Sequence, residues 1–246
     1  MLFVKRVLYD KFERDYMAGT VMHLVIADRL LDILKIKNAA LFYCGNLAPD
    51  AIMGRKDYQR EMKNITHFKN GQKPYTFRIK ENQEIYHKRL YEFVNTYLIK
   101  NADDYELYLG YIVHLLVDEL YLLNYYEYFL RELEEKGISP EDEKFCNSYI
   151  GDVDRIDWEL VRTYNFKYKM PDILRSLTDY EIKDYIKSAE IENSKAFIIN
   201  KNFETIHKRE PLEVTTYEMN NNFIELCVSK IPVMLKERFG ELLEDR

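Results

Sequence analysis

Two residues in the middle of the chain have the types and the spacing of a metal-binding pair. His114 and Asp118 stand four positions apart in Y-L-G-Y-I-V-H-L-L-V-D-E-L-Y, so a helix would project both from one face, about one turn apart. Their neighbours are Leu, Ile and Val, and an unpaired carboxylate in such surroundings is costly. A divalent ion removes that cost, because it favours the ionised acid and the neutral imidazole together. The competing interpretation is a core histidine that is hydrogen-bonded to a neighbour.

Two other histidines, in the N-terminal half of the chain, are also candidate metal ligands. Of the five histidines, His23 lies in the apolar run V-M-H-L-V-I-A and His67 lies in I-T-H-F. His87 and His207 lie among charged residues, in E-I-Y-H-K-R-L-Y and T-I-H-K-R-E, and we interpret them as surface residues. Three histidines and the carboxylates near them are therefore the candidates for metal-ligand chemistry.

The elements that must position these residues are predicted from apolar periodicity. Residues 20–37 have the pattern of an amphipathic helix, with His23 near its start. From residue 42 to residue 75 the periodicity is lost and Gly, Asn and Pro accumulate, which predicts a loop with at most a short helix beginning at Pro49. Asp50 and His67 would lie within that loop.

The rest of the chain has helix signals throughout. Periodicity returns at residues 81–100, and Asp103 with Glu106 forms a capping-box pattern before a helix predicted to run to Lys136. Further helix starts are predicted at Ser139-Pro140, at Thr178 with Glu181 and at Thr215 with Glu218, with a kink at Pro232. With little Gly or Pro, the composition favours an all-α class. We expect one helical domain over residues 1–246, with a metal-binding core at about 20–136 and a helical C-terminal extension at about 139–246.

Charge, cysteine usage and hydropathy exclude several classes of protein. A formal net charge of −6 argues against general binding to nucleic acid. The three cysteines are far apart, so they predict neither a disulfide framework nor a zinc knuckle. The N-terminus has no continuous apolar core of a secretory signal, and no segment is apolar enough to span a bilayer. The sequence therefore predicts a cytoplasmic protein that is not an integral membrane protein, and it leaves the oligomeric state open.

Four motifs in order resemble the bacterial zinc-dependent phospholipase C family, which is related to helical zinc-dependent single-strand nucleases. They are M-H-L-V-I-A-D-R-L, F-Y-C-G-N-L-A-P-D-A, I-T-H-F and Y-L-G-Y-I-V-H-L-L-V-D, within about residues 20–125. The resemblance implies a multi-helix fold with an orthogonal, bundle-like arrangement. It implies that Asp50, His67, His114 and Asp118 surround one zinc ion, and that Asp118 bridges to a second ion held by His23. Asp50 could also act as a base towards the attacking water.

The chain departs from the family in the ligands beyond this set. Family members complete the cluster with the N-terminal residue of the processed chain, whereas 22 residues precede His23 here. The family has a further histidine where Asn124 stands, and no H-x-x-x-E follows. We therefore expect a reduced site with one or two zinc ions, although His and Asp ligands also accept other divalent metals. Asp152, after Gly151, is a candidate extra ligand or hydrogen-bond partner for a ligand histidine, although a solvated acidic face is the alternative.

Two other groups could contact a substrate. Lys63, Lys69 and Lys73 lie near His67 in the sequence and could form a cationic rim that attracts phosphate, although surface lysines are common. An aromatic run follows Asp118 on the same predicted helix and could line a pocket for a ring or acyl chain, although packing between helices is the more frequent role: Tyr121, Tyr125, Tyr126, Tyr128 and Phe129.

The sequence thus predicts a metal-dependent hydrolase, specifically a phosphoesterase that uses a metal-activated water on a small phosphoester or phospholipid-like substrate. One alternative is a non-catalytic, metal-stabilised helical module for binding or sensing. Another is a nucleotide phosphohydrolase, for which the usual adjacent His-Asp pair is absent from the sequence.

Overall fold

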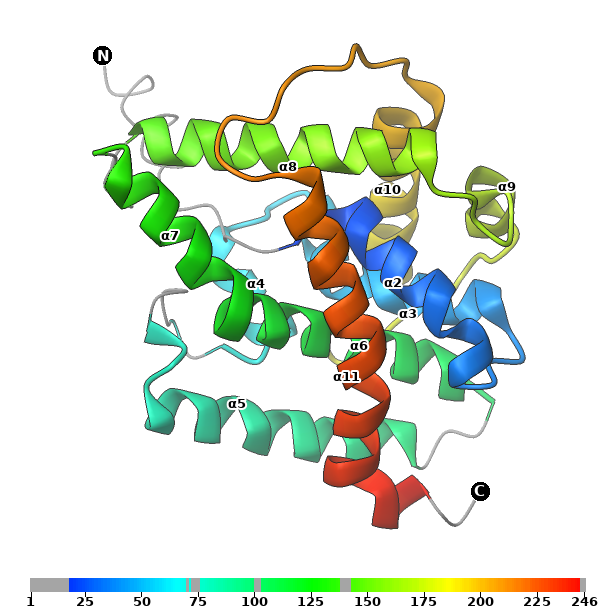
Figure 1. Cartoon of the computed structure of the whole chain (residues 1–246). Coiled ribbons are helices and arrows are strands. Elements are labelled where there is room, and N and C mark those ends of the chain that lie inside the picture. The colour runs from blue at the N-terminus through cyan, green and yellow to red at the C-terminus, as the bar shows by residue number, and fades with distance from the viewer. Residues whose placement is uncertain (1–17, 70, 72–75, 100–102, 138–142, 244–246) are drawn as a thin grey trace.

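The computed structural model describes residues 18–69, 71, 76–99, 103–137 and 143–243 (Figure 1). Apart from an isolated bridge between Ile182 and Ile186, these residues form helices and their connections, so the prediction of an all-α fold is confirmed. The α-helices are α2 (Thr20–Ile33), α3 (Ala39–Ala51), α4 (Lys63–Thr66), α5 (Lys80–Phe93), α6 (Tyr105–Leu120), α7 (Tyr126–Glu135), α8 (Glu143–Thr163), α9 (Met170–Arg175), α10 (Ser188–Ile198) and α11 (Tyr217–Leu243). Short 3₁₀ turns (Ile52–Gly54, Arg60–Met62) and π-helical turns (Val94–Leu98, Tyr121–Tyr125, Ile199–Glu204) join some of them.

Helix α6 lies at the centre of the fold. Every residue from Leu107 to Leu120 is buried, as expected for a helix that is apolar on all sides. Helices α2, α3 and α11 all pack against it, and Figure 1 shows α11 crossing in front of it. His114 and Asp118 are therefore core residues, as their apolar neighbours predicted.

The loop predicted for residues 42–75 is wrong in its first part, because residues 39–51 form α3. Asn38 caps this helix, its side chain accepting a hydrogen bond from the Leu41 N–H. Gly45 marks the crossing with α6, since a Cβ there would lie 1.8 Å from the Leu107 carbonyl oxygen. Pro49 lies inside the helix near its C-terminal end. Gly and Pro here reflect a close helix–helix contact and a helix end, so Asp50 is held on a helix.

Other predicted helix starts were displaced. The helix at Asp103 begins at Tyr105 with Asp104 at its cap, and no helix follows Thr178, where the chain makes turns until α10. The last helix is capped by Thr216, whose hydroxyl accepts a hydrogen bond from the Met219 N–H. The Ser139-Pro140 signal lies outside the described residues, and α8 begins at Glu143.

The C-terminal helices pack directly against the N-terminal ones. Helix α2 contacts α8 and α11, and α3 contacts α9 and α10. Figure 1 shows α8 lying across one end of the molecule, with α11 descending from beside it. Among the described residues, no helix combines the length and the apolar character that crossing a membrane demands.

The N-terminal end of α2, which carries His23, is held by an acid from another helix. Asp157 on α8 accepts hydrogen bonds from the backbone N–H groups of Val21 (3.0 Å) and Met22 (3.1 Å). Gly19 makes this approach possible, since a Cβ there would lie 2.3 Å from the Asp157 carboxylate. Asp157 is thus buried. Burial raises its pKa to about 7, although the two N–H groups oppose that rise.

The raised pKa of Asp157 predicts a distinct pH dependence of stability. Between about pH 4 and pH 7 the folded state keeps a proton that the unfolded state releases, so stability falls as the pH rises through this window. The free energy of unfolding of the wild type, minus that of Asp157→Asn, should therefore decrease across the window, by at most about 1.4 kcal/mol per pH unit. Chemical denaturation at several pH values measures this difference, with Asp154→Asn on the same helix as the control. A flat difference would mean that Asp157 is ionised throughout.

Candidate metal centre

The five residues predicted as ligands meet at one place in the core. His23 comes from α2, Asp50 from the end of α3, His67 directly follows α4, and His114 and Asp118 come from α6. The three histidines and Asp118 are buried, whereas the Asp50 side chain is 14 % exposed. Residues far apart in the sequence thus form one cluster, with Asp50 on its most accessible side.

The separations within the cluster match those between ligands of one metal ion. His67 Nε2 lies 3.3 Å from Asp50 Oδ1 and 3.7 Å from Asp118 Oδ2, and His114 Nε2 lies 3.5 Å from the same Asp118 oxygen. His23 Nε2 lies 3.4 Å from the other oxygen, Asp118 Oδ1. Two ligands of a tetrahedral zinc ion stand about 3.4 Å apart, given Zn–N and Zn–O bonds of about 2.1 Å. The side chains therefore need little movement to bind an ion.

The donor atoms that face this space are also unsatisfied. Within the described residues, the Nε2 atoms of His23, His67 and His114 and both oxygens of Asp118 are buried without a hydrogen bond. Buried polar atoms nearly always have partners, because leaving each one unpaired costs about 1–3 kcal/mol. Such a concentration of unpaired ligand atoms fits binding of one or two divalent ions, which would satisfy them.

Two of the histidines are oriented by hydrogen bonds on their other ring nitrogen. His114 Nδ1 lies 2.8 Å from the Asn46 carbonyl oxygen, and since a carbonyl only accepts, His114 donates from Nδ1 and leaves Nε2 free for a metal. His67 Nδ1 lies 2.9 Å from the Thr66 hydroxyl, which in turn donates to the Lys63 carbonyl oxygen. Asn46 lies in the F-Y-C-G-N-L-A-P-D-A motif, but its role here was not predicted, because its backbone carbonyl and not its side chain is the acceptor. Thr66 is next to His67 in the sequence, so a hydrogen bond between the two side chains was predictable.

The pKa values of the clustered side chains are set by burial and by the pairing of the histidines with Asp118. Burial lowers the pKa of His67 to about 4 and lowers that of His23, which also stacks on His114 with ring centroids 3.9 Å apart. Burial acts on His114 in the same direction, but Asp118 outweighs it and raises the His114 pKa. Burial opposes ionisation of Asp118, yet His114 and His23 hold its pKa below the usual range. The cluster therefore favours neutral His23 and His67 and an ionised Asp118, the states that bind metal.

The two oxygens of Asp118 divide the cluster into two overlapping groups. Asp50, His67 and His114 form one, and His23, His114 and Asp118 form the other. In the first group Asp118 Oδ2 is a fourth nearby donor. Within the described residues the second group has only its three members, so it is the less complete of the two.

Asp152 is not brought to this cluster. Its carboxylate accepts hydrogen bonds from the backbone N–H groups of Glu213 (2.8 Å), Val214 (2.9 Å) and Thr215 (2.9 Å), and it pairs with Arg155. These contacts leave no role for a metal to fill, and they anchor the segment that precedes α11. The amides that occupy Asp152 lie far away in the sequence, so the sequence alone could not reveal them.

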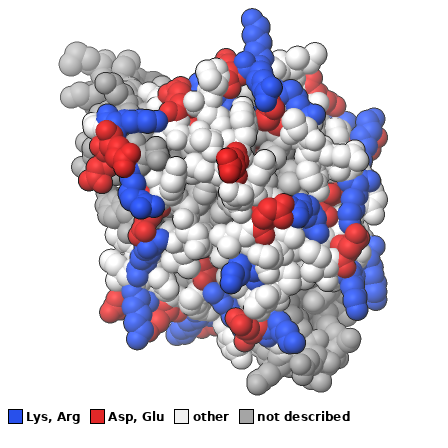
Figure 2. Space-filling model, viewed as in Figure 1, with Lys and Arg blue, Asp and Glu red and all other residues white. Residues whose placement is uncertain are grey.

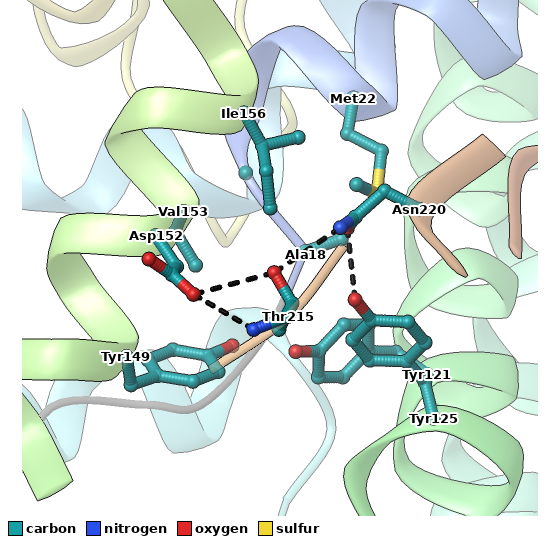
Figure 3. Close-up of a pocket in the computed structure, with 11 residues that line it drawn as sticks. Ala18, Met22, Tyr121, Tyr125, Tyr149, Asp152, Val153, Ile156, Thr215 and Asn220 are labelled. Atoms are coloured by element: carbon teal, nitrogen blue, oxygen red, sulfur yellow. Dashed lines mark hydrogen bonds between the residues drawn. The ribbon is translucent and has the colours of Figure 1, made fainter. Parts of the chain in front are cut away.

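Asp152 instead lines a small pocket between α2, α8 and the segment that precedes α11 (Figure 3). Tyr121 and Tyr125 are on its wall, and Tyr125 donates a hydrogen bond to Asn220 Oδ1 (2.9 Å). Both rings also pack against Phe223 on α11, which is the packing role that the sequence left open. Tyr121 is three residues after Asp118, and Met22, beside His23, also lines the pocket. The pocket therefore adjoins the two elements that carry the second ligand group.

Residues 22–120 match the family model described as zinc dependent phospholipase C, which confirms the resemblance drawn from the four motifs. The matched segment is less than half of the chain and contains all five clustered residues. No curated protein and no solved structure matches the chain. The match supports a metal-dependent hydrolase with zinc as its metal.

Proposed function

We propose that this chain is a metal-dependent phosphoesterase that hydrolyses a phosphoester with a metal-activated water. The observation that carries the proposal is the cluster of buried, unpaired donor atoms on residues of the matched family segment. A divalent ion bound there would lower the pKa of a water and stabilise negative charge on phosphoryl oxygens. A phospholipid-like substrate agrees with the family, and a small phosphoester would use the same chemistry.

In this proposal the clustered residues would bind two metal ions. His67, His114 and Asp118, with Asp50, would hold the first ion, and His23 with Asp118 would hold a second. Asn46 and Thr66 keep the imidazoles of His114 and His67 in the ligating tautomer.

Asp50 differs from the other ligands in its exposure, so it can meet an incoming water and accept its proton. Burial opposes the ionisation of Asp50, but Lys63 and His67 hold its pKa well below the usual range. A carboxylate with a lowered pKa is a better ligand than base, so ligation is its first role in this proposal.

Zinc removal and ligand loss test the proposal together. The zinc-loaded protein is assayed on a panel of phosphomonoesters and phosphodiesters, before and after chelation and in the variant His114→Ala. We expect hydrolysis of at least one panel member, lost on chelation, restored by zinc, and reduced by at least about 100-fold in His114→Ala. His87→Ala is the control, because the His87 side chain is 40 % exposed and pairs with Glu119, which is not a member of the cluster. A zinc-loaded wild type inert towards the whole panel would contradict the proposal.

The burial of the clustered side chains supports a second candidate function, a metal-stabilised module without catalysis. Four of the five clustered side chains are almost inaccessible to solvent, as in a structural metal site that is closed by protein. Zinc bound without any hydrolysis would favour this function.

A further inference from the structure

Lys63 is held in an unusual place for a lysine. Its side chain is only 11 % exposed, and its Nζ lies 2.7 Å from Asp50 Oδ1. Lysines are rarely buried unless they are paired with an acid. Its backbone is fixed by the turn that carries a ligand, since the Lys63 carbonyl oxygen accepts a hydrogen bond from the His67 N–H (2.9 Å). The turn that positions His67 therefore also places an ammonium group at the edge of the cluster.

One carboxylate oxygen faces both this ammonium and the metal ligands. Asp50 Oδ1 lies 2.7 Å from Lys63 Nζ and 3.3 Å from His67 Nε2. When that oxygen serves a divalent ion, its single negative charge is shared between the ion and the ammonium. One carboxylate does not neutralise both a divalent ion and an ammonium group, so this edge of the cluster keeps a positive charge when the ion is bound. The arrangement therefore favours a further anion beside the metal.

The anion would arrive from the side where Lys63 stands. Asp50 and Lys63 are more exposed than the three histidines and Asp118. Lys69 is two residues after His67 in the sequence and is buried, so it is a second cationic side chain near this ligand in the sequence.

We propose that Lys63, beside the metal, forms a binding subsite for the terminal phosphate of a phosphomonoester. This inference rests on the proposed function and narrows its substrate class. An ammonium has three donors and binds phosphate as a compact charge. A terminal phosphate carries about two negative charges near neutral pH, and a phosphodiester carries one, so an added cation favours the monoester.

Calorimetric titration of inorganic phosphate into the zinc-loaded protein tests this subsite without an activity assay. Lys63→Met should weaken phosphate binding by at least about tenfold while the zinc content stays at the wild-type value. Lys63→Arg should recover most of the affinity because the charge is restored. Lys88→Met is the matched control, since Lys88 is 77 % exposed and pairs with Glu92 on α5. The wild type should also hydrolyse a phosphomonoester faster than the diester of the same alcohol, and Lys63→Met should reduce that preference.

Three results would overturn the inference. Equal phosphate affinity in zinc-loaded wild type and Lys63→Met would contradict the subsite and leave the proposed function intact. Loss of zinc in Lys63→Met, with zinc kept in Lys63→Arg, would make Lys63 a support for Asp50 only. A wild-type protein that binds no zinc would contradict the proposed function, and the subsite with it.

Discussion

Replacing Asp118 by asparagine is expected to abolish the stabilisation of the protein by zinc. Both oxygens of Asp118 face imidazole nitrogens, and it is the one residue that contacts three histidines of the cluster. Zinc at about 1,000 times its dissociation constant stabilises a folded protein by about 4 kcal/mol. For a chain of this size that corresponds to a rise in Tm of about 10 °C. The wild type should show this rise on adding zinc, and Asp118→Asn should show almost none.

Thermal unfolding with and without zinc, together with elemental analysis of zinc per chain, makes the measurement. Asp172→Asn is a suitable control, because Asp172 is largely exposed and pairs with Lys169, three residues away. Asp118→Asn protein that keeps both its zinc and the rise in Tm would show that Asp118 is not a ligand.

Replacing Gly110 by alanine is expected to cost about 3 kcal/mol or more of folding free energy. A Cβ at Gly110 would lie 2.1 Å from the Phe42 carbonyl oxygen and 2.8 Å from the Asn46 backbone nitrogen. Both atoms belong to the backbone of α3, so the helices themselves would have to separate. The separation would also move the Asn46 carbonyl oxygen away from His114, and zinc affinity should fall with stability.

Chemical denaturation compares this variant with Gly240→Ala. At Gly240, near the end of α11, the nearest atom to a new Cβ is 3.7 Å away on the flexible Lys236 side chain. Alanine there should raise stability by about 0.5–1 kcal/mol, because it restricts the unfolded chain and favours helix. Wild-type stability in Gly110→Ala would mean that α3 and α6 are not in close contact at this point.

The parts of the fold that sequence patterns predict well are those governed by local periodicity. The apolar run around His114 forms a buried helix, and residues 81–98 are helical as expected. The gathering of His23, Asp50 and His67 around that helix did not come from periodicity. It was implied by the ordered motifs of the family resemblance, and the structure places all of these residues in one cluster.

The parts that could not be predicted depend on contacts between distant segments. Gly45 and Pro49 are loop signals by residue type, and only the partner helix α6 gives Gly45 its packing role. Asp152 was a reasonable ligand candidate by type, but backbone N–H groups near residue 214 already occupy its carboxylate. The ion pair between Lys63 and Asp50 joins two side chains whose proximity depends on how α4 folds back towards α3.

The origin of the ligands on α2, α3, α4 and α6 makes metal content a reporter of tertiary structure. No short segment of the chain carries the cluster, so an unfolded or loosely collapsed chain offers zinc only scattered donors. A substitution anywhere among these helices can therefore lower zinc occupancy without touching a ligand. A zinc content of one or two ions per folded chain would indicate that the four elements have assembled in their native arrangement. Loss of zinc in a variant identifies the replaced residue as a ligand only when that variant is shown to be folded.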